Sequence, residues 1–239
     1  MHTDDTGWRV GGEPAYLLVF ETDGATVYQI RPRHRHEAVQ EGIPAHYDGG
    51  LVPDRGRSYD AQAFDGVPQQ KCLAHIQRSI SEVLATQGGR ARDFGEQLKG
   101  LLQEALELWP ADRDSGGTDV KVDAEALQEA ITDQLRHRSL KDPDNQRVLN
   151  ELGWHHDRGN LLRFLVKPRV EPTHNRAERA LRPAVIARTV SQCSKNGRGA
   201  STFAVFPRVI RTRLKTGTAS VVDSLSQLLH PTQLQDASN

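Results

Sequence analysis

The chain has 239 residues, of which 36% are hydrophobic, so it can bury a full core and is neither a disordered tail nor a disulfide-stapled mini-protein. Its 31 basic residues balance its 31 acidic residues, so the net charge by itself points to no class of partner. Two cysteines cannot build a disulfide framework, and no apolar run approaches the ~20 residues of a membrane helix. We therefore expect a cytoplasmic protein with neither signal peptide nor membrane contact.

The first third of the sequence predicts a mixture of strands and helices. Residues 15–30 contain two β-rich runs around a four-residue loop that ends in glycine, which predicts a β-hairpin. Residues 33–40 are polar and partly helical, and residues 49–54 predict a short buried strand that ends in Asp54. A helix is predicted after residues 69–73 from the apolar positions Ile76, Ile80, Val83 and Leu84.

From residue 88 to about residue 165 the pattern predicts helices only. The clearest of them ends at Pro110 and is followed by a loop over residues 111–119. Thr173 or His174 is a suitable N-cap for a later helix that ends near Ala187. Another helix is expected from Ser201 to Lys215, although Pro207 inside it costs ~3 kcal/mol.

Charge is distributed unevenly over these parts. Residues 82–144 carry 14 acidic and 8 basic side chains, whereas residues 161–215 carry 13 basic and two acidic ones. A basic C-terminal third favours contact with the phosphates of a nucleic acid over a merely solvated surface.

Three carboxylates stand out by their context. Asp4 lies where a first strand is predicted to end, Asp54 ends the next predicted strand outside the hairpin, and Glu178 lies on a predicted helix among arginines. Taken singly, each has a plain structural interpretation, as a turn residue or as the i,i+4 partner of Arg182. Taken together, they offer the oxygen ligands that two divalent ions need in phosphodiester chemistry.

Several motifs in order carry a family resemblance. The chain resembles the insertion sequence 66 family of bacterial DDE transposases over about residues 2–220. The similar segments are Asp-Asp-Thr-Gly-Trp-Arg-Val at residues 4–10, Asp54 with Tyr59-Asp60, Cys-Leu-Ala-His-Ile-Gln-Arg at residues 72–78, and Asn-Arg-Ala-Glu-Arg with Leu-Arg-Pro at residues 175–183.

The resemblance implies an α/β fold: a ribonuclease-H-like mixed sheet interrupted by an all-helical insertion. The core would comprise residues 1–87 and 169–229, the insertion residues 88–168, and a flexible tail residues 230–239. It also implies DNA cleavage and strand transfer that depend on Mg²⁺ or Mn²⁺, with Asp4, Asp54 and Glu178 as the catalytic and metal-binding triad. Adjacent strand residues face opposite ways, so either Asp4 or Asp5 faces the metals.

DNA at the transposon ends and at the target is the implied partner, bound by a homo-oligomer that associates with the nucleoid. Arg176, Arg179 and Arg182 form a band along the predicted helix that either holds phosphates or is a solvated face. The full set of DNA-binding candidates is Arg176, Arg179, Arg182, Arg188, Lys195 and Arg198.

Some features depart from the family pattern and leave alternatives open. Only three residues precede Asp4, so we expect a shortened first strand in an N-terminally truncated chain. The alternative function is an inactive remnant that binds DNA non-specifically through its basic third. Cys72 and His75 resemble half of a zinc site, with residues 155–157 as a second half, but packing with a local hydrogen bond is the preferred interpretation.

Overall fold

The structure is a computed structural model that describes residues 1–44, 47–115, 118–136, 138–167, 169–217, 220 and 222–223. The chain forms two compact units, of which the first is discontinuous: Met1–Tyr47 joins Asn175–Asn239, and Asp48–His174 forms the second. By its contacts, the segment of residues 48–87 belongs to the same unit as the helices of residues 88–168. The sequence pattern had instead placed residues 48–87 in the core and the boundaries of the insertion at residues 87 and 168. The predicted tail at residues 230–239 lies outside the described residues.

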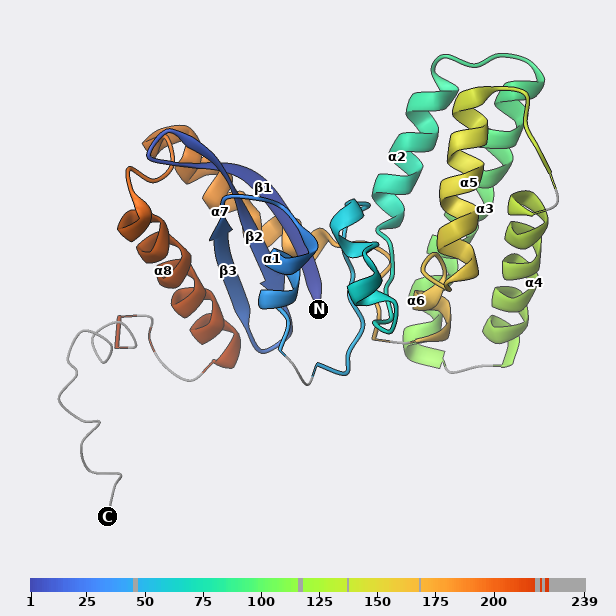
Figure 1. Ribbon diagram of the computed structural model, residues 1–239. Helices are drawn as coiled ribbons and strands as arrows, with labels where there is room; N and C mark the ends of the chain where they lie inside the picture. The colour runs from blue at the N-terminus through green and yellow to red at the C-terminus, as the bar shows by residue number, and fades with distance from the viewer. Residues whose placement is uncertain are drawn as a thin grey trace. The chain divides into compact units, whose positions relative to one another are not determined.

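The first unit contains a three-stranded antiparallel sheet (Figure 1). Its strands are β1 (His2–Val10), β2 (Glu13–Glu21) and β3 (Thr26–Arg31), in that order across the sheet. The predicted hairpin is confirmed as β2 and β3. Between β1 and β2, Gly11 and Gly12 have φ of 62° and 88°, a turn that glycine adopts without strain. With nine residues, β1 is not the shortened strand that we expected.

The two faces of this sheet pack against different helices. One face carries Trp8, Ala15, Leu17, Val19 and Tyr28, which form a core with the small residues Ala177, Ala180, Leu181 and Ala184 of α7 (Asn175–Ser191). Helix α8 (Gly197–Thr216) adds Phe203 to the same core, with its ring centroid 4.6 Å from that of Trp8. On the opposite face Phe20 packs beside Gly42, at the end of α1 (His36–Glu41). Alternation along each strand therefore gives the sheet two buried faces.

Helix α8 confirms the predicted helix over residues 201–215 and begins earlier, at Gly197. The Asn196 side chain caps it by accepting a hydrogen bond of 2.9 Å from the Gly199 amide, and Gly217 ends it with a φ of 63°. Pro207 lies inside the helix. Contacts such as the 2.5 Å ion pair between Lys215 and Glu21 tie the helix to the sheet and help to offset the cost of that proline.

The second unit is mainly helical (Figure 1). After the short helices Arg57–Tyr59 and Gln62–Phe64 come α2 (Leu73–Leu84), α3 (Arg90–Ser115), α4 (Thr118–Leu135), α5 (Pro143–Asp157) and α6 (Arg163–Val166). Their apolar faces share one core, which includes Ile76, Leu98, Ile131, Leu149 and Phe164. The prediction of α2 from its apolar spacing is confirmed.

Two local predictions in this unit need correction. The helix predicted to end at Pro110 continues to Ser115, and α4 begins at Thr118, so the loop predicted over residues 111–119 is wrong. Packing of α3 against α2 and α4 outweighs the single backbone hydrogen bond that the proline removes. The strand predicted at residues 49–54 is reduced to a parallel bridge from Leu51 to Gln69. Among the described strands the sheet is antiparallel rather than mixed.

Candidate active site

Asp4 lies on the face of the sheet that α7 covers. Side chains alternate along β1, so Asp4 points to the same face as Thr6 and Trp8. Its cross-strand partner is Val19, which belongs to the core formed with α7. Asp5 takes the opposite face, where its carboxylate lies 3.4 Å from His34 Nδ1. Asp4 is half-buried, and its Oδ1 accepts a hydrogen bond of 2.9 Å from the Asp5 amide. Of the two neighbouring acids, therefore, Asp4 is the one directed to the helix side of the sheet.

Glu178 lies in the first turn of α7, the helix that packs on the face of the sheet to which Asp4 belongs. Asp4, Val19 and Tyr28 are paired across the three strands, and the Tyr28 hydroxyl donates a 2.7 Å hydrogen bond to the carbonyl of Ala180. Glu178 stands two residues earlier in the first turn of α7 and is exposed. Burial raises the pKa of Tyr28 to about 12, so this hydroxyl stays a donor. Two of the three predicted acids thus belong to the first unit, Asp4 on β1 and Glu178 on the helix that packs against this face of the sheet.

Asp54 belongs to the second unit. It follows the buried residues Leu51 and Val52, and its Oδ1 accepts a hydrogen bond of 2.7 Å from the Gly56 amide. This is a local turn in which an aspartate side chain caps the backbone two residues on, and it holds one carboxylate oxygen in place. Asp54 is half-buried. The plain interpretation as a turn residue thus describes its local geometry correctly, and a carboxylate oriented in this way can still bind a cation.

The predicted DNA-binding side chains divide into two groups. Arg176 forms a 2.6 Å ion pair with Asp23, which lowers the pKa of that carboxyl, and Arg188 donates hydrogen bonds to Thr6 and to the Gly7 carbonyl. Both therefore fasten α7 to the sheet. The other four are exposed along and after α7, and these are Arg179, Arg182, Lys195 and Arg198. The band expected from helical spacing is therefore partly a structural contact and partly an exposed basic surface.

A cluster of one thiol and two imidazoles lies at the start of α2. Cys72, His75 and His174 each direct one ligand atom into a group whose members lie within 4.8 Å of one another. Burial disfavours the Cys72 thiolate, but hydrogen bonds from His174 and His75 outweigh it and lower the pKa of the thiol to about 6. Cys72 and His174 are fully buried, and His75 is half-buried. The sequence pointed to Cys72 and His75, whereas His174 was predicted only as a helix cap.

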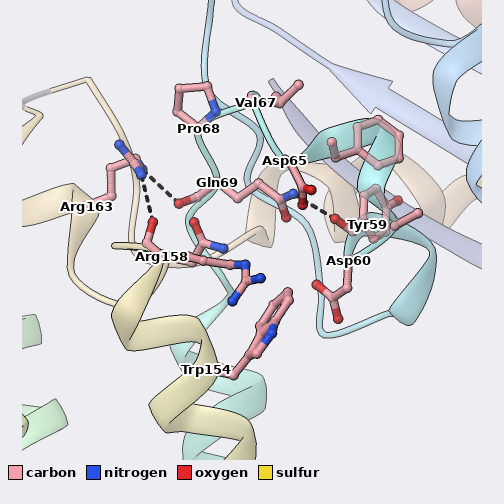
Figure 2. A pocket seen from close by; sticks show the side chains of 13 residues that line it. Tyr59, Asp60, Asp65, Val67, Pro68, Gln69, Trp154, Arg158 and Arg163 are labelled. Atoms are coloured by element: carbon pink, nitrogen blue, oxygen red, sulfur yellow. Dashed lines mark hydrogen bonds between the residues drawn. The ribbon is translucent and has the colours of Figure 1, made fainter.

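A cavity of about 270 Å³ in the second unit is lined by residues of α5, of α6 and of the segment before α2 (Figure 2). Trp154 of α5 is 36% exposed, and the guanidinium carbon of Arg158 lies 3.6 Å from the centroid of its indole. On the other side Arg163 Nε donates a 2.9 Å hydrogen bond to the Gln69 carbonyl. Asp60 also faces the cavity, as Figure 2 shows, and pairs at 2.7 Å with the fully buried Lys71. No motif in the sequence indicated this ion pair.

Comparison with known proteins identifies the family of the chain. The model of the transposase IS66 family matches residues 1–202, which include all three predicted acids. No curated protein and no solved structure gives a significant match. None of the described helices is long and apolar enough to cross a membrane. With both the motifs and most of its length matched by one family model, the chain belongs to the transposase IS66 family.

Proposed function

We propose that this protein is the catalytic part of a transposase that cleaves and joins DNA strands with Mg²⁺ or Mn²⁺ bound by Asp4, Asp54 and Glu178, on a ribonuclease-H-like core. The observation that carries the proposal is that α7, the helix of Glu178, packs on the face of the sheet to which Asp4 belongs. Membership of a transposase family supplies the substrate class, which is DNA.

The donor set fits a hard divalent cation. Asp4 and Asp54 are half-buried carboxylates, each already oriented by a backbone amide, and Glu178 is exposed at the start of a helix. Carboxylate oxygens are the ligands that Mg²⁺ prefers. A bound ion would supply neutralisation of the charge that develops on the scissile phosphate and would lower the pKa of an attacking hydroxyl.

Basic side chains near Glu178 would orient the DNA by binding its phosphates. The exposed Arg179 and Arg182 lie one and four residues beyond Glu178, so they can bind phosphates next to the reacting one. Lys195 and Arg198 extend this basic surface beyond the end of α7. Arg176 and Arg188 act indirectly by fastening α7 to the sheet. As transposition joins two DNA ends, we further propose that the active form is a homo-oligomer assembled on DNA.

A nicking assay tests the catalytic part of the proposal. The full chain is incubated with a supercoiled plasmid that carries the ends of its element, with EDTA, Mg²⁺ or Mn²⁺. We expect nicking only with metal, and a loss of at least ~100-fold in Asp4→Asn, Asp54→Asn and Glu178→Gln, because each removes a charged ligand. Glu37→Gln, an exposed change on α1, is the matched control and keeps its activity.

Activity that persists in Asp54→Asn or Glu178→Gln would refute the assignment. A chain that binds DNA in a salt-sensitive manner but never nicks it would instead favour the inactive remnant. Binding is tested separately with Arg179→Ala/Arg182→Ala, which we expect to lower the slope of log affinity against log salt by about 1.8 if two phosphate contacts are lost. The exposed Arg138→Ala in the second unit is the control and leaves the slope unchanged.

A further inference from the structure

We propose that Cys72, His75 and His174 bind a zinc ion, at a site separate from the three carboxylates. The ligand atoms of the three side chains lie within 4.8 Å of one another, and all three residues belong to the second unit. One thiolate and two imidazoles are soft and intermediate donors of the kind that zinc binds, and they disfavour Mg²⁺. This inference goes beyond the proposed DNA chemistry and does not depend on it.

The spacing of the donors matches tetrahedral zinc. With Zn–S of about 2.3 Å and Zn–N of about 2.05 Å, a tetrahedral angle places sulfur and nitrogen about 3.6 Å apart. The distance from Cys72 Sγ to His75 Nδ1 is 3.5 Å. The ring centroids of His75 and His174 are 4.8 Å apart, so the second imidazole lies alongside the first. Three protein ligands leave a fourth position that water can fill.

The backbone around the cluster holds these side chains in position. Cys72 is the N-cap of α2 and His75 lies three residues later, so both project from the same side of the first helical turn. The Leu73 amide donates a 2.9 Å hydrogen bond to the Pro172 carbonyl, which brings the segment that ends in His174 to this turn. The Cys72 amide donates a hydrogen bond of 3.2 Å to the Pro53 carbonyl. Two segments distant in sequence are thereby fixed at the start of one helix.

The proposed zinc ligands lie next in the chain to the segments that carry two of the predicted acids. His174 immediately precedes α7, and Glu178 follows within the first turn of that helix. Pro53, whose carbonyl accepts the hydrogen bond from the Cys72 amide, immediately precedes Asp54. A zinc ion would therefore hold the backbone that immediately precedes Asp54 and the residue that immediately precedes α7. Burial of Cys72 and His174 fits such a role, because ordered and desolvated ligands favour a permanently held ion.

Metal analysis of the untagged full chain tests this proposal, since a polyhistidine tag would itself bind zinc. We expect about one zinc ion per chain after dialysis, with most of it lost in Cys72→Ser and in His174→Ala. Replacing Cys193, the half-buried second cysteine, by serine is the matched control for the thiol, and His36→Ala, at a half-buried position on α1, is the control for the imidazole. Both controls keep their zinc.

Cobalt substitution provides a second measurement that does not depend on the buried variants folding normally. Co²⁺ added to the metal-free chain should give a thiolate-to-cobalt absorption band that persists in Cys193→Ser and weakens in His75→Ala, a change at a half-buried position. A chain that takes up no zinc, or that keeps it in both Cys72→Ser and His174→Ala, overturns the proposal. Fast alkylation of Cys72 in a chain without any zinc affinity would also overturn it, and would identify a reactive thiolate instead.

Discussion

His155 is the group through which we expect acid to destabilise the second unit. Its side chain is 2% exposed near the C-terminal end of α5. Burial, followed by the positive charge of Lys71, lowers the pKa of His155 from 6.5 to about 4; Asp60 and Glu151 oppose this change, and Arg55 adds to it. The native protein therefore keeps this imidazole neutral at a pH where the unfolded chain is protonated.

The sign and the size of the effect follow from these two pKa values. Between pH 6.5 and pH 4 the unfolded chain binds a proton at His155 that the native chain does not, so acid favours unfolding. The contribution of His155 is complete above pH 6.5 and is lost as the pH falls towards 4. Linkage gives a loss of about 2 kcal/mol between pH 7 and pH 5, and about 3 kcal/mol in total by pH 4.

Urea denaturation at pH 7 and pH 5 measures this loss. The indole of Trp154 lies edge-on to the His155 ring, with centroids 4.8 Å apart, and reports on unfolding of this region by its fluorescence. Because protonation can also quench that signal, the transition midpoint rather than the amplitude is compared. We expect His155→Gln to lose about 2 kcal/mol less than the wild type on acidification. The control is His36→Gln, at a side chain that is 42% exposed, and it should behave as the wild type.

An equal loss of stability in the wild type and in His155→Gln would refute this reasoning. So would an NMR titration in which the His155 ring is protonated near pH 6.5, because the native ring would then take up its proton at the same pH as the unfolded chain. Either result would mean that the native fold does not keep the His155 imidazole neutral below pH 6.5.

Three further expectations concern packing and capping. Gly42→Ala would place its Cβ 2.1 Å from the Phe20 ring and should lower the free energy of unfolding by about 1–3 kcal/mol in urea titrations, a loss that Phe20→Leu partly restores. Asp60→Asn leaves the fully buried Lys71 without its anion and should cost about 3–5 kcal/mol, whereas Lys71→Met should cost clearly less; equal costs would contradict this asymmetry. Asn196→Ala removes the cap of α8 and should cost about 1 kcal/mol, with a measurable loss of helical circular dichroism on heating.

Local patterns in the sequence predicted much of the fold. The alternating runs at residues 15–30 became β2 and β3, and the apolar spacing after residue 73 became α2, because each pattern matches the period of its element. Proline positions were less informative. Pro110 and Pro207 both lie inside helices, since tertiary packing can offset a single missing backbone hydrogen bond.

Long-range pairing is what the sequence could not supply. The choice between Asp4 and Asp5 depends on the register of β1 against β2, which fixes the face that each side chain takes. His174 lies about a hundred residues from Cys72, and no local pattern indicated that a backbone hydrogen bond to Pro172 brings it to α2. The triad itself remains a prediction, with two of its members placed on packed elements of one unit.

The discontinuity of the first unit has a consequence for synthesis on the ribosome. Its strands are made first, but the helices that cover Leu17, Val19 and Tyr28 are made only after the whole of Asp48–His174. The nascent sheet must therefore wait with an apolar face exposed, while the second unit has all of its own sequence and can fold at once. Closing so long a loop costs little more entropy than closing a short one, because the cost grows only with the logarithm of length. The insertion therefore delays folding of the first unit without greatly lowering its stability. A chaperone that binds exposed strands would act during this delay.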